Sequence, residues 1–348
     1  MVVIDSLCNP IYSSFYIIGL YELFGEKNVC FSSEPFIGLT KRSLNLNFVI
    51  YEKGTTKKIS IDYNDSNVLS DTELYSWCDI YGKVNTNWEV TPKKQYSKIV
   101  SLAPSFGIRI WSIYKTLFHA FKNIDVLSFK FNVSMYRKHL GKYRRMFVRC
   151  PYNRYTLNND VSVNYIFHLS TLWYSNNYNK NDEEVNARRA RFIRVCKLMP
   201  LTFEGGFASQ GSHRSSEVLF NDCLFDKSLS MKKWLEKTKS SMIVYNTPSF
   251  WNCHGWKLGE YLALGKAILS TKVSNDLPAP LIHGEHIHFV DDNEASIQEA
   301  IQYLIDNPEY RKKLEFGART WWETYGTPMK SLELLGLKNG VKKSSELF

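Results

Sequence analysis

The alternation of apolar and polar segments along the chain separates a regular second half from a less regular first half. From about residue 164, short apolar runs typical of buried strands alternate with longer helical patterns, and turn residues separate them. Repeated strand–helix units of this length require a parallel sheet with helices on both faces. The second half is therefore predicted to be a Rossmann-like α/β domain.

The elements of this second half follow from the same pattern. Pro200 ends the first predicted helix and Gly265 ends the third, since proline cannot continue a helix and glycine tolerates the backbone beyond it. The predicted strands are residues 165–170, 201–207, 242–245, 267–270 and 286–290. The predicted helices are residues 183–198, 231–239, 256–264 and 295–305, with a last helical run at 309–335.

The first half mixes strands and helices with less regular alternation. Apolar runs at 48–51 and 58–61 flank Gly54 and predict a β-hairpin. Further strands are expected at 76–81 and 98–102, and the second of these leads through a Pro/Gly turn into a helix at 111–121. An earlier helix is expected at 12–24, ended by Gly25.

The chain of 348 residues is long enough for two domains. We expect a Rossmann-like α/β domain at 1–160 and a second Rossmann-like domain at 161–338. The polar residues 339–348 are expected to form a frayed tail. The first apolar run, 15–20, is far shorter than the roughly 18 residues that a membrane-spanning helix needs, so neither an export signal nor a membrane span is expected.

Positive charge is concentrated in the middle of the chain. Residues 121–200 contain fifteen Lys or Arg against five Asp or Glu, which accounts for the whole net charge of +10. Two clusters, at 137–154 and 188–197, carry most of it. Such patches suit nucleic acid, an anionic membrane or a phosphorylated substrate, and the second cluster also fits a solvated helical face. No nucleic-acid-binding motif accompanies them, so no nucleic-acid partner is predicted.

The seven cysteines are an odd number and are scattered, without a metal-binding spacing. This usage argues against both a disulfide framework and a zinc site. It favours a reducing, cytoplasmic compartment.

The segment 252–270 carries the sharpest chemical signal. Gly255 begins a predicted helix, whose first-turn N–H groups have no partner within the helix and can receive a diphosphate. Lys257 and Glu260 are three residues apart and therefore share one helix face. A cation near the phosphates and a carboxylate one turn further suit the two ends of a nucleotide-sugar, because the carboxylate can accept hydrogen bonds from ribose hydroxyls.

Further candidate residues have weaker signals. Gly206 ends a predicted strand and Arg214 lies in the polar loop beyond it, so both are candidates for the donor site. Gly107 and Arg109, in the turn after the 98–102 strand, are candidates for the acceptor side, the place where a molecule that receives the sugar would bind. Asp79 and His254 are candidate general bases that could deprotonate a hydroxyl of this acceptor. The reverse roles, a strand-end cap for Asp79 and a structural histidine for His254, remain open.

The segment 252–270 resembles the donor-site signature of GT-B-fold glycosyltransferases, specifically the C-terminal domain of bacterial families 1 and 4. Glu260 matches the ribose-binding Glu of that signature, and residues 265–270 match the turn and strand that follow it. Many retaining members carry a second Glu eight positions upstream, where this chain has Asn252, so the stereochemical outcome stays open. The resemblance covers about residues 165–325.

The resemblance implies two Rossmann-like domains facing a central cleft, with a C-terminal helix that packs back toward the N-terminal domain. It assigns acceptor binding to the domain at 1–160 and donor binding to the domain at 161–338. It also implies that no metal and no cofactor is needed, since a helix N-terminus and basic side chains take the place of the cation.

The predicted function is transfer of a sugar from a nucleotide-sugar donor to a hydroxyl of a glycan or lipid-linked acceptor, in surface polysaccharide or lipopolysaccharide synthesis. The enzyme is expected to be cytoplasmic, with the basic patch at 137–154 contacting the anionic inner face of the membrane. A nucleotide-sugar epimerase of the same architecture is the alternative, followed by a basic nucleic-acid-binding protein. Replacement of Glu260 by alanine is expected to abolish nucleotide binding, whereas replacement of Arg189 is expected to leave it unchanged.

Overall fold

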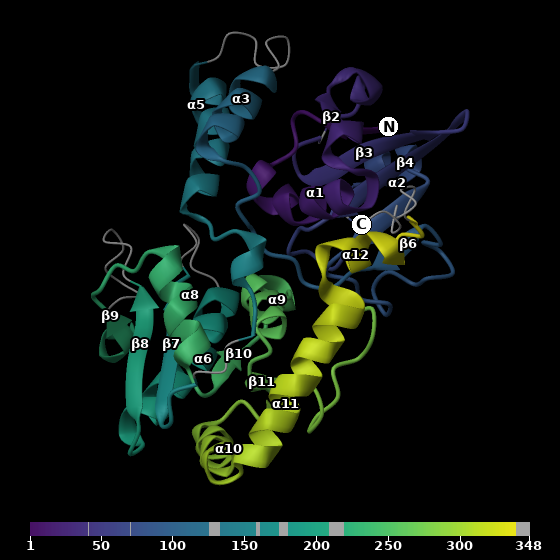
Figure 1. The fold of residues 1–348 in the computed structure, drawn as a ribbon. Coiled ribbons are helices and arrows are strands. Elements are labelled where there is room, and N and C mark those ends of the chain that lie inside the picture. The colour runs from purple at the N-terminus through teal and green to yellow at the C-terminus, as the bar shows by residue number, and fades with distance from the viewer. Residues whose placement is uncertain are drawn as a thin grey trace, which may run out of the picture. The chain divides into compact units, whose positions relative to one another are not determined.

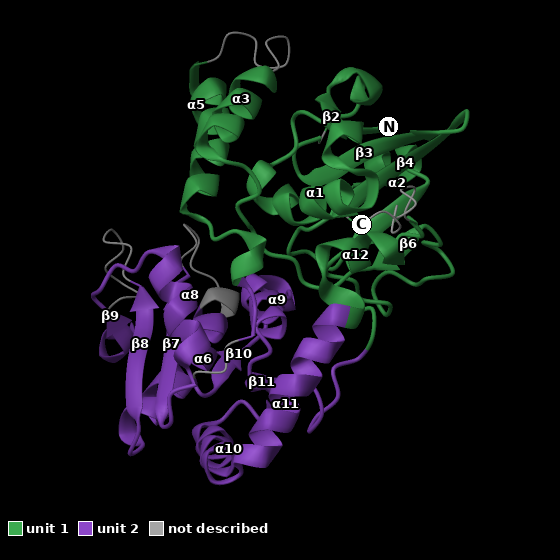
Figure 2. Ribbon diagram, in the orientation of Figure 1, with its two compact units in different colours: residues 1–154, 276–279, 324–348 green, residues 155–275, 280–323 purple. Residues whose placement is uncertain are grey.

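The chain forms two compact units (Figure 2). The computed structural model describes residues 1–40, 42–69, 71–124, 133–157, 161–173, 180–208 and 219–338. Unit 1 comprises Met1–Arg154, Asp276–Ala279 and the segment from Thr324, and unit 2 comprises Tyr155–Asn275 and Pro280–Glu323. The main segment of unit 1 ends at Arg154, where the sequence suggested a boundary at 160. The predicted frayed tail, 339–348, lies outside the described residues.

Unit 1 is built on a six-stranded sheet in the order β2-β1-β3-β4-β5-β6 (Figure 1). Among its described strands only β3 runs antiparallel to its neighbours. The carboxyl ends of the other five therefore meet at one edge of the sheet. The strands are β1 (Val2–Asp5), β2 (Val29–Ser32), β3 (Asn45–Glu52), β4 (Thr55–Asp62), β5 (Ile80–Lys83) and β6 (Ile99–Ser101).

The last helix of the described chain belongs to unit 1, as the resemblance led us to expect. Helix α12 (Pro328–Leu334) packs against α1 (Pro10–Phe24), and a Cβ added at Gly19 would lie 2.6 Å from the Pro328 carbonyl oxygen. This close approach requires the glycine. The other helices of the unit are α2 (Thr72–Trp77), α3 (Ile113–Lys122) and α5 (Val133–Arg144).

The predicted elements of unit 1 are confirmed in part. Strands β3 and β4 form the expected hairpin, and positive φ angles at Lys53 (48°) and Gly54 (79°) make its two-residue turn. The strand predicted at 76–81 is wrong in its first half, because the Asp71 side chain accepts from the Leu74 N–H and starts α2 there. Strand β5 begins only at Ile80.

Unit 2 contains two parallel three-stranded sheets that meet at β7 and β10. The Met242 N–H donates to the Tyr165 carbonyl at 2.7 Å, and the Phe167 N–H donates to Ser241 Oγ at 2.8 Å. The joined order β9-β8-β7-β10-β11-β12 reverses between β7 and β10, as in a Rossmann fold. The strands are β7 (Tyr165–Thr171), β8 (Thr202–Ala208), β9 (Leu224–Phe225), β10 (Val244–Asn246), β11 (Ile268–Thr271) and β12 (His288–Val290).

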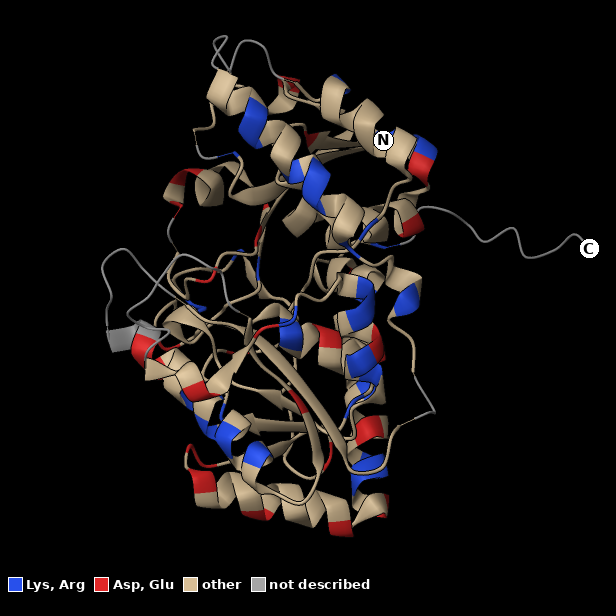
Figure 3. Ribbon diagram, turned by 90° about the vertical axis from the view of Figure 1, so that its left-hand side faces the viewer, with Lys and Arg blue, Asp and Glu red and all other residues tan. Residues whose placement is uncertain are grey.

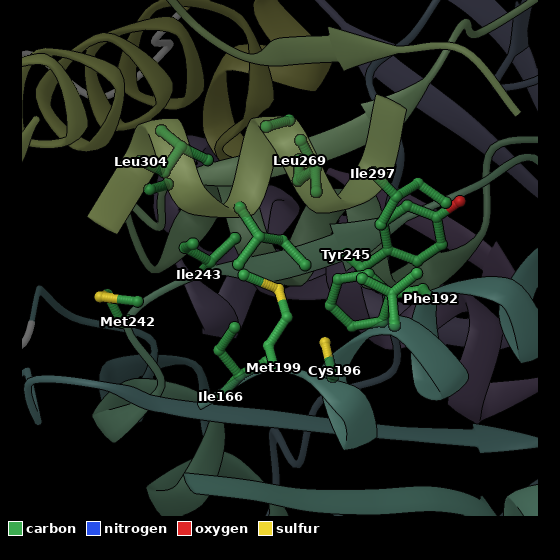
Figure 4. Close-up of a cluster of buried hydrophobic side chains, with 14 of the residues drawn as sticks. Ile166, Phe192, Cys196, Met199, Met242, Ile243, Tyr245, Leu269, Ile297 and Leu304 are labelled. Atoms are coloured by element: carbon green, nitrogen blue, oxygen red, sulfur yellow. The ribbon is translucent and has the colours of Figure 1, made fainter. Parts of the chain in front are cut away.

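The predicted α/β class and the Rossmann-like second half are therefore confirmed. The apolar faces of strands and helices meet in one core, in which the Phe192 and Tyr245 rings stack with centroids 4.3 Å apart and Leu269 and Ile297 are fully buried (Figure 4). The helices of this unit are α6 (Lys180–Leu198), α8 (Met231–Ser240), α9 (Trp256–Ala263), α10 (Glu294–Asp306) and α11 (Pro308–Trp321), the last followed by a π-helical turn at Trp322–Gly326.

None of the helices in the described part of the chain combines the length and the apolar character that a bilayer span requires.

Candidate functional site

Lys257 lies at the point where the strand order of unit 2 reverses. It belongs to the first turn of α9. Its Nζ donates to the Leu169 carbonyl at 2.5 Å and to Ser170 Oγ at 2.8 Å, at the carboxyl end of β7. Helix α9 begins after Gly255, as predicted. The start of α9 and the ammonium group thus meet at the switch point, where open α/β sheets bind ligands.

Arg189 brings a second cation to the same edge. From α6, its Nη1 donates to the Thr171 carbonyl and its Nη2 to Ser249 Oγ, each at 3.3 Å. Among the described residues, no carboxylate forms an ion pair with either Arg189 or Lys257, although both side chains are half-buried. Two cations in this setting form a site for an anion that carries more than one negative charge.

The electrostatics of the site follow from this arrangement. Burial and, to a smaller extent, the Arg189 charge lower the pKa of Lys257 from 10.5 to about 7, and Glu260 opposes both effects. Burial also lowers the pKa of Arg189 to about 10. Each cation is therefore held at a cost in the unliganded protein. A bound diphosphate would reverse that cost by supplying the missing negative charge.

His168 lies beneath the two cations on β7. It is buried, and its Nε2 is 2.7 Å from Ser170 Oγ. Burial and the charges of Lys257 and Arg189 hold the pKa of His168 well below its usual value, so the ring is neutral at pH 7. Because His168 adds no charge, the positive potential of the site comes from Lys257 and Arg189.

The loop between β10 and α9 has a fixed and strained shape. Trp251 and Asn252 both adopt left-handed backbone conformations, with φ of 48° and 58°. For a tryptophan this costs about 1–2 kcal/mol, so surrounding contacts must impose it. The Ser249 N–H donates to the Cys253 carbonyl at 3.0 Å, and Asn275 Nδ2 donates to the Asn252 carbonyl at 3.2 Å. The loop is thereby set in one conformation beside the switch point.

Glu260 lies one turn beyond Lys257 in α9, as the spacing predicted. Its side chain is only 4% exposed, and the Tyr155 hydroxyl donates to its Oε1 at 3.2 Å. His254 is also buried and directly precedes Gly255. The structure thus gathers Gly255, Lys257 and Glu260 on one helix, with His254 at its start.

Gly206 does not leave its strand as predicted. It lies inside β8, and a Cβ at this position would approach the Cys223 carbonyl oxygen to 2.3 Å. The missing side chain is explained by the neighbouring backbone, and the donor-site role of Gly206 stays a prediction. Arg214, the other residue predicted for this loop, lies outside the described residues.

The candidates in unit 1 fall into different surroundings. Asp79 is exposed and precedes β5, at the amino end of the strand, where its Oδ2 accepts from the Lys58 N–H at 2.7 Å. Ligands of open α/β sheets bind at the opposite, carboxyl edge, so the position of Asp79 favours the capping role, and its role as a general base stays a prediction. Gly107 is buried in the segment between β6 and α3, whereas Arg109 is exposed and donates its N–H to the Cys150 carbonyl at 3.0 Å.

The basic cluster at 188–197 is not a uniform solvated face. Arg188 and Arg191 pair with Asp292, and Arg194 pairs with Asp222. Lys and Arg residues lie along several helices (Figure 3). Arg189 and Lys257 differ from the arginines above in that no described carboxylate forms an ion pair with them. From the sequence we expected Arg189 to have no part in nucleotide binding. It lies in a run of basic residues, and nothing in the spacing of that run distinguishes it from its neighbours.

The described residues contain no group of three His, Cys, Asp or Glu side chains that could hold a metal ion. All seven cysteines are free.

Unit 2 therefore has the sheet order of a Rossmann fold and two half-buried cations, Arg189 and Lys257, at its switch point. No protein-family model matches the sequence, and no curated protein does either. Among solved structures, the chain is similar to a glycosyltransferase from Rickettsia africae, with 12% identity and a TM-score of 0.45 over 79% of this chain and 68% of that one.

Two further solved structures are similar to the chain. One is sucrose-phosphate synthase from Thermosynechococcus elongatus, with 10% identity and a TM-score of 0.45 over 80% of this chain and 66% of that one. The other is an Anabaena protein, HepE, in complex with UDP-glucose, with 10% identity and a TM-score of 0.39 over 78% and 96%. Because these identities are so low, the function has to be inferred from the residues of the site itself.

Proposed function

We propose that the protein is a GT-B-type glycosyltransferase that transfers a sugar from a nucleotide-sugar to an acceptor hydroxyl. One observation carries the proposal: Lys257 and Arg189 converge on the carboxyl end of β7, beside the start of α9, with no carboxylate of the described residues paired to either. A nucleoside diphosphate supplies the charge, the shape and the polar groups that this edge accepts. When the sugar passes to the acceptor oxygen, the nucleoside diphosphate leaves with an additional negative charge, which the same cations stabilise.

The nucleotide part of the proposal is tested by thermal unfolding with UDP, GDP, CMP and dTDP. A nucleotide at a hundred times its Kd adds about 2.7 kcal/mol to the free energy of unfolding, so one of the four should raise the Tm by several degrees. If none of them changes the Tm, the donor site does not exist as proposed.

The reaction part is tested by incubating the preferred nucleotide-sugar with the protein alone and with candidate acceptors. A transferase changes the donor sugar only when an acceptor or water takes it. An epimerase of similar architecture would instead convert the donor sugar to its epimer without any acceptor. Appearance of the epimer in the protein-only sample would replace the transferase by this alternative.

We further propose that transfer is independent of divalent metal. Lys257, Arg189 and the N-terminus of α9 supply the positive charge that a cation provides in other sugar transferases. Activity should persist in excess EDTA. Loss of activity with chelator and its return with Mn²⁺ would contradict this model of the site.

We also propose that the acceptor is presented at an anionic membrane surface, as expected for lipid-linked glycans of surface polysaccharide or lipopolysaccharide synthesis. The support is helix α3, which buries its small and polar side and exposes its large apolar one. Tyr114, Phe118 and Phe121 are 86%, 59% and 63% exposed. Neither α3 nor the adjacent α5 contains an acidic residue, and α5 adds basic residues of the 137–154 patch (Figure 1). Aromatic and basic side chains together are typical of interfacial helices.

Sedimentation with lipid vesicles tests the membrane proposal. The protein should sediment with vesicles that contain phosphatidylglycerol, less so with added salt, and poorly with vesicles of phosphatidylcholine alone. Replacing Phe118 and Phe121 by serine removes about 3 kcal/mol of apolar contact and should weaken binding about a hundredfold. Phe316→Ser, at a 75% exposed aromatic residue of α11, is the matched control. Equal binding of all three proteins would refute the role of α3.

The free state of all seven cysteines supports our further proposal that the protein works in the cytoplasm, on the inner face of the membrane.

A further inference from the structure

Unit 1 holds a pocket of about 430 Å³ next to the carboxyl end of β1. Its ionisable lining includes Arg42, Lys138, His139 and Lys142, and its apolar lining includes Leu7 and Met135. The volume is typical of sites for small molecules, and the carboxyl edge of a largely parallel sheet is where such sites occur.

Arg42 is fixed in the wall of this pocket by a buried carboxylate. Its Nε and Nη2 donate to the two oxygens of Asp5, at 2.9 and 2.6 Å, and its side chain is 9% exposed. Its Nη1 donates to none of the described residues. The guanidinium is therefore held in one orientation, with a nitrogen left over for a ligand.

Lys138 and Lys142 supply charge that the described residues do not neutralise. They are four residues apart on α5 and therefore project from the same face, where like charges repel by about 0.2–0.5 kcal/mol. Neither forms an ion pair with a described carboxylate, and burial lowers the pKa of the half-buried Lys142. An anion between them would remove both penalties.

The other ionisable groups near the pocket are already engaged. Asp5 is paired with Arg42, and Glu73 accepts from the N–H and the hydroxyl of Thr40. The His139 Nε2 lies 2.9 Å from the Ala120 carbonyl, and burial lowers the pKa of His139, so its ring is neutral at pH 7. The two lysines therefore dominate the charge that a ligand meets.

We propose that this pocket binds a phosphate group of the acceptor, held between Lys138, Lys142 and Arg42, with Leu7 and Met135 against its less polar part. The inference rests on the proposed transferase function and names its acceptor class, a phosphate ester. A phosphorylated glycan and a lipid headgroup share this chemistry.

Equilibrium dialysis with labelled inorganic pyrophosphate tests the pocket apart from the donor site. Wild-type protein should bind two pyrophosphates, of which UDP displaces one. Lys138→Gln/Lys142→Gln should bind one, displaced by UDP, with at least tenfold weaker binding at the pocket. Lys257→Met should keep the site that UDP does not displace. Lys312→Gln/Lys313→Gln on α11 makes the same change of net charge and should bind two.

The outcomes separate this inference from the proposed function. If wild-type protein binds a single pyrophosphate that UDP displaces, or if Lys138→Gln/Lys142→Gln still binds two, the acceptor pocket is refuted and the donor site stands. If none of UDP, GDP, CMP and dTDP displaces a pyrophosphate, the proposed function fails. Competition for the second pyrophosphate by a sugar phosphate supports a phosphorylated glycan, and competition only by phosphatidylglycerol vesicles supports a lipid headgroup. Competition by neither overturns the assignment to an acceptor.

Discussion

Replacing Lys257 by methionine is expected to stabilise the unliganded protein at pH 7 while removing its nucleotide site. Methionine keeps the length and flexibility of the side chain but carries no charge. In the unliganded protein, Lys257 is half-buried beside Arg189, and its pKa falls from 10.5 to about 7. The charge is thus a cost to folding that ligand binding can justify, as at many functional sites.

The size of the effect follows from that pKa. At about 1.4 kcal/mol for each pKa unit, the fall corresponds to about 5 kcal/mol, an upper bound because solvent screens a half-buried charge. Against this, the variant leaves the Leu169 carbonyl and Ser170 Oγ without their donor, which costs about 1–3 kcal/mol. At pH 7 we expect a net gain of about 1–3 kcal/mol in the free energy of unfolding.

The dependence on pH has a definite sign. Between pH 7 and 10.5 the unfolded chain keeps a proton on Lys257 that the folded chain has released, so wild-type stability increases with pH in this window. Below pH 7 the full cost is present. The advantage of Lys257→Met should therefore shrink by up to about 1.4 kcal/mol for each pH unit above 7 and reverse toward pH 10.

Urea unfolding followed by tryptophan fluorescence at pH 7, 8 and 9 measures this difference, since groups elsewhere cancel between the two proteins. Lys313→Met, at an exposed position of α11, is the control and should change stability little at any pH. UDP affinity of the wild type should fall by up to tenfold for each pH unit above 7, as Lys257 must regain its proton to bind the diphosphate. A stability difference that stays constant from pH 7 to 9 would refute the reasoning.

Three further substitutions test the site residue by residue. Arg189→Gln should weaken UDP binding at least tenfold, measured by calorimetry. Arg188→Gln, on the same helix as Arg189, removes one partner of the ion pair with Asp292 and should not weaken UDP binding. Glu260→Ala should abolish the thermal shift with UDP but not pyrophosphate binding; if Tyr155→Phe gives the same loss, Glu260 acts by holding Tyr155 and not the ribose. Asp79→Asn should leave the rate of transfer within twofold of wild type, and a loss of a hundredfold or more would restore it as a candidate base.

The fold of unit 2 could be predicted from the sequence because its helices and strands are separated by clear breaks. Pro200 lies two residues after the end of α6, and Gly265, with φ of 58°, lies two residues after the end of α9. Unit 1 was predicted less completely. Strands β1 and β2 have only four residues each, too few for a period to show. Asp71 starts a helix whose last two residues overlap the run 76–81 that was predicted as a strand.

The candidate site could be predicted only along its own helix. Gly255, Lys257 and Glu260 lie within six residues of sequence, and helix geometry alone places the last two on one face. Arg189 reaches the same edge from α6, and Ser170 from β7. Which arginine of a basic helix faces the sheet edge depends on how that helix packs on its sheet, and local spacing does not carry this information.

Ion pairs with carboxylates determine how much of the positive charge in the middle of the chain can act on a ligand. On α6, Arg188, Arg191 and Arg194 are neutralised by Asp292 and Asp222, so they contribute little field beyond the surface. The cations that no described carboxylate neutralises include two pairs, Lys257 with Arg189 and Lys138 with Lys142. Each pair lies at the carboxyl edge of its own sheet, where α/β proteins bind ligands. The proposed transfer from an anionic donor to an anionic acceptor would use one such pair in each unit.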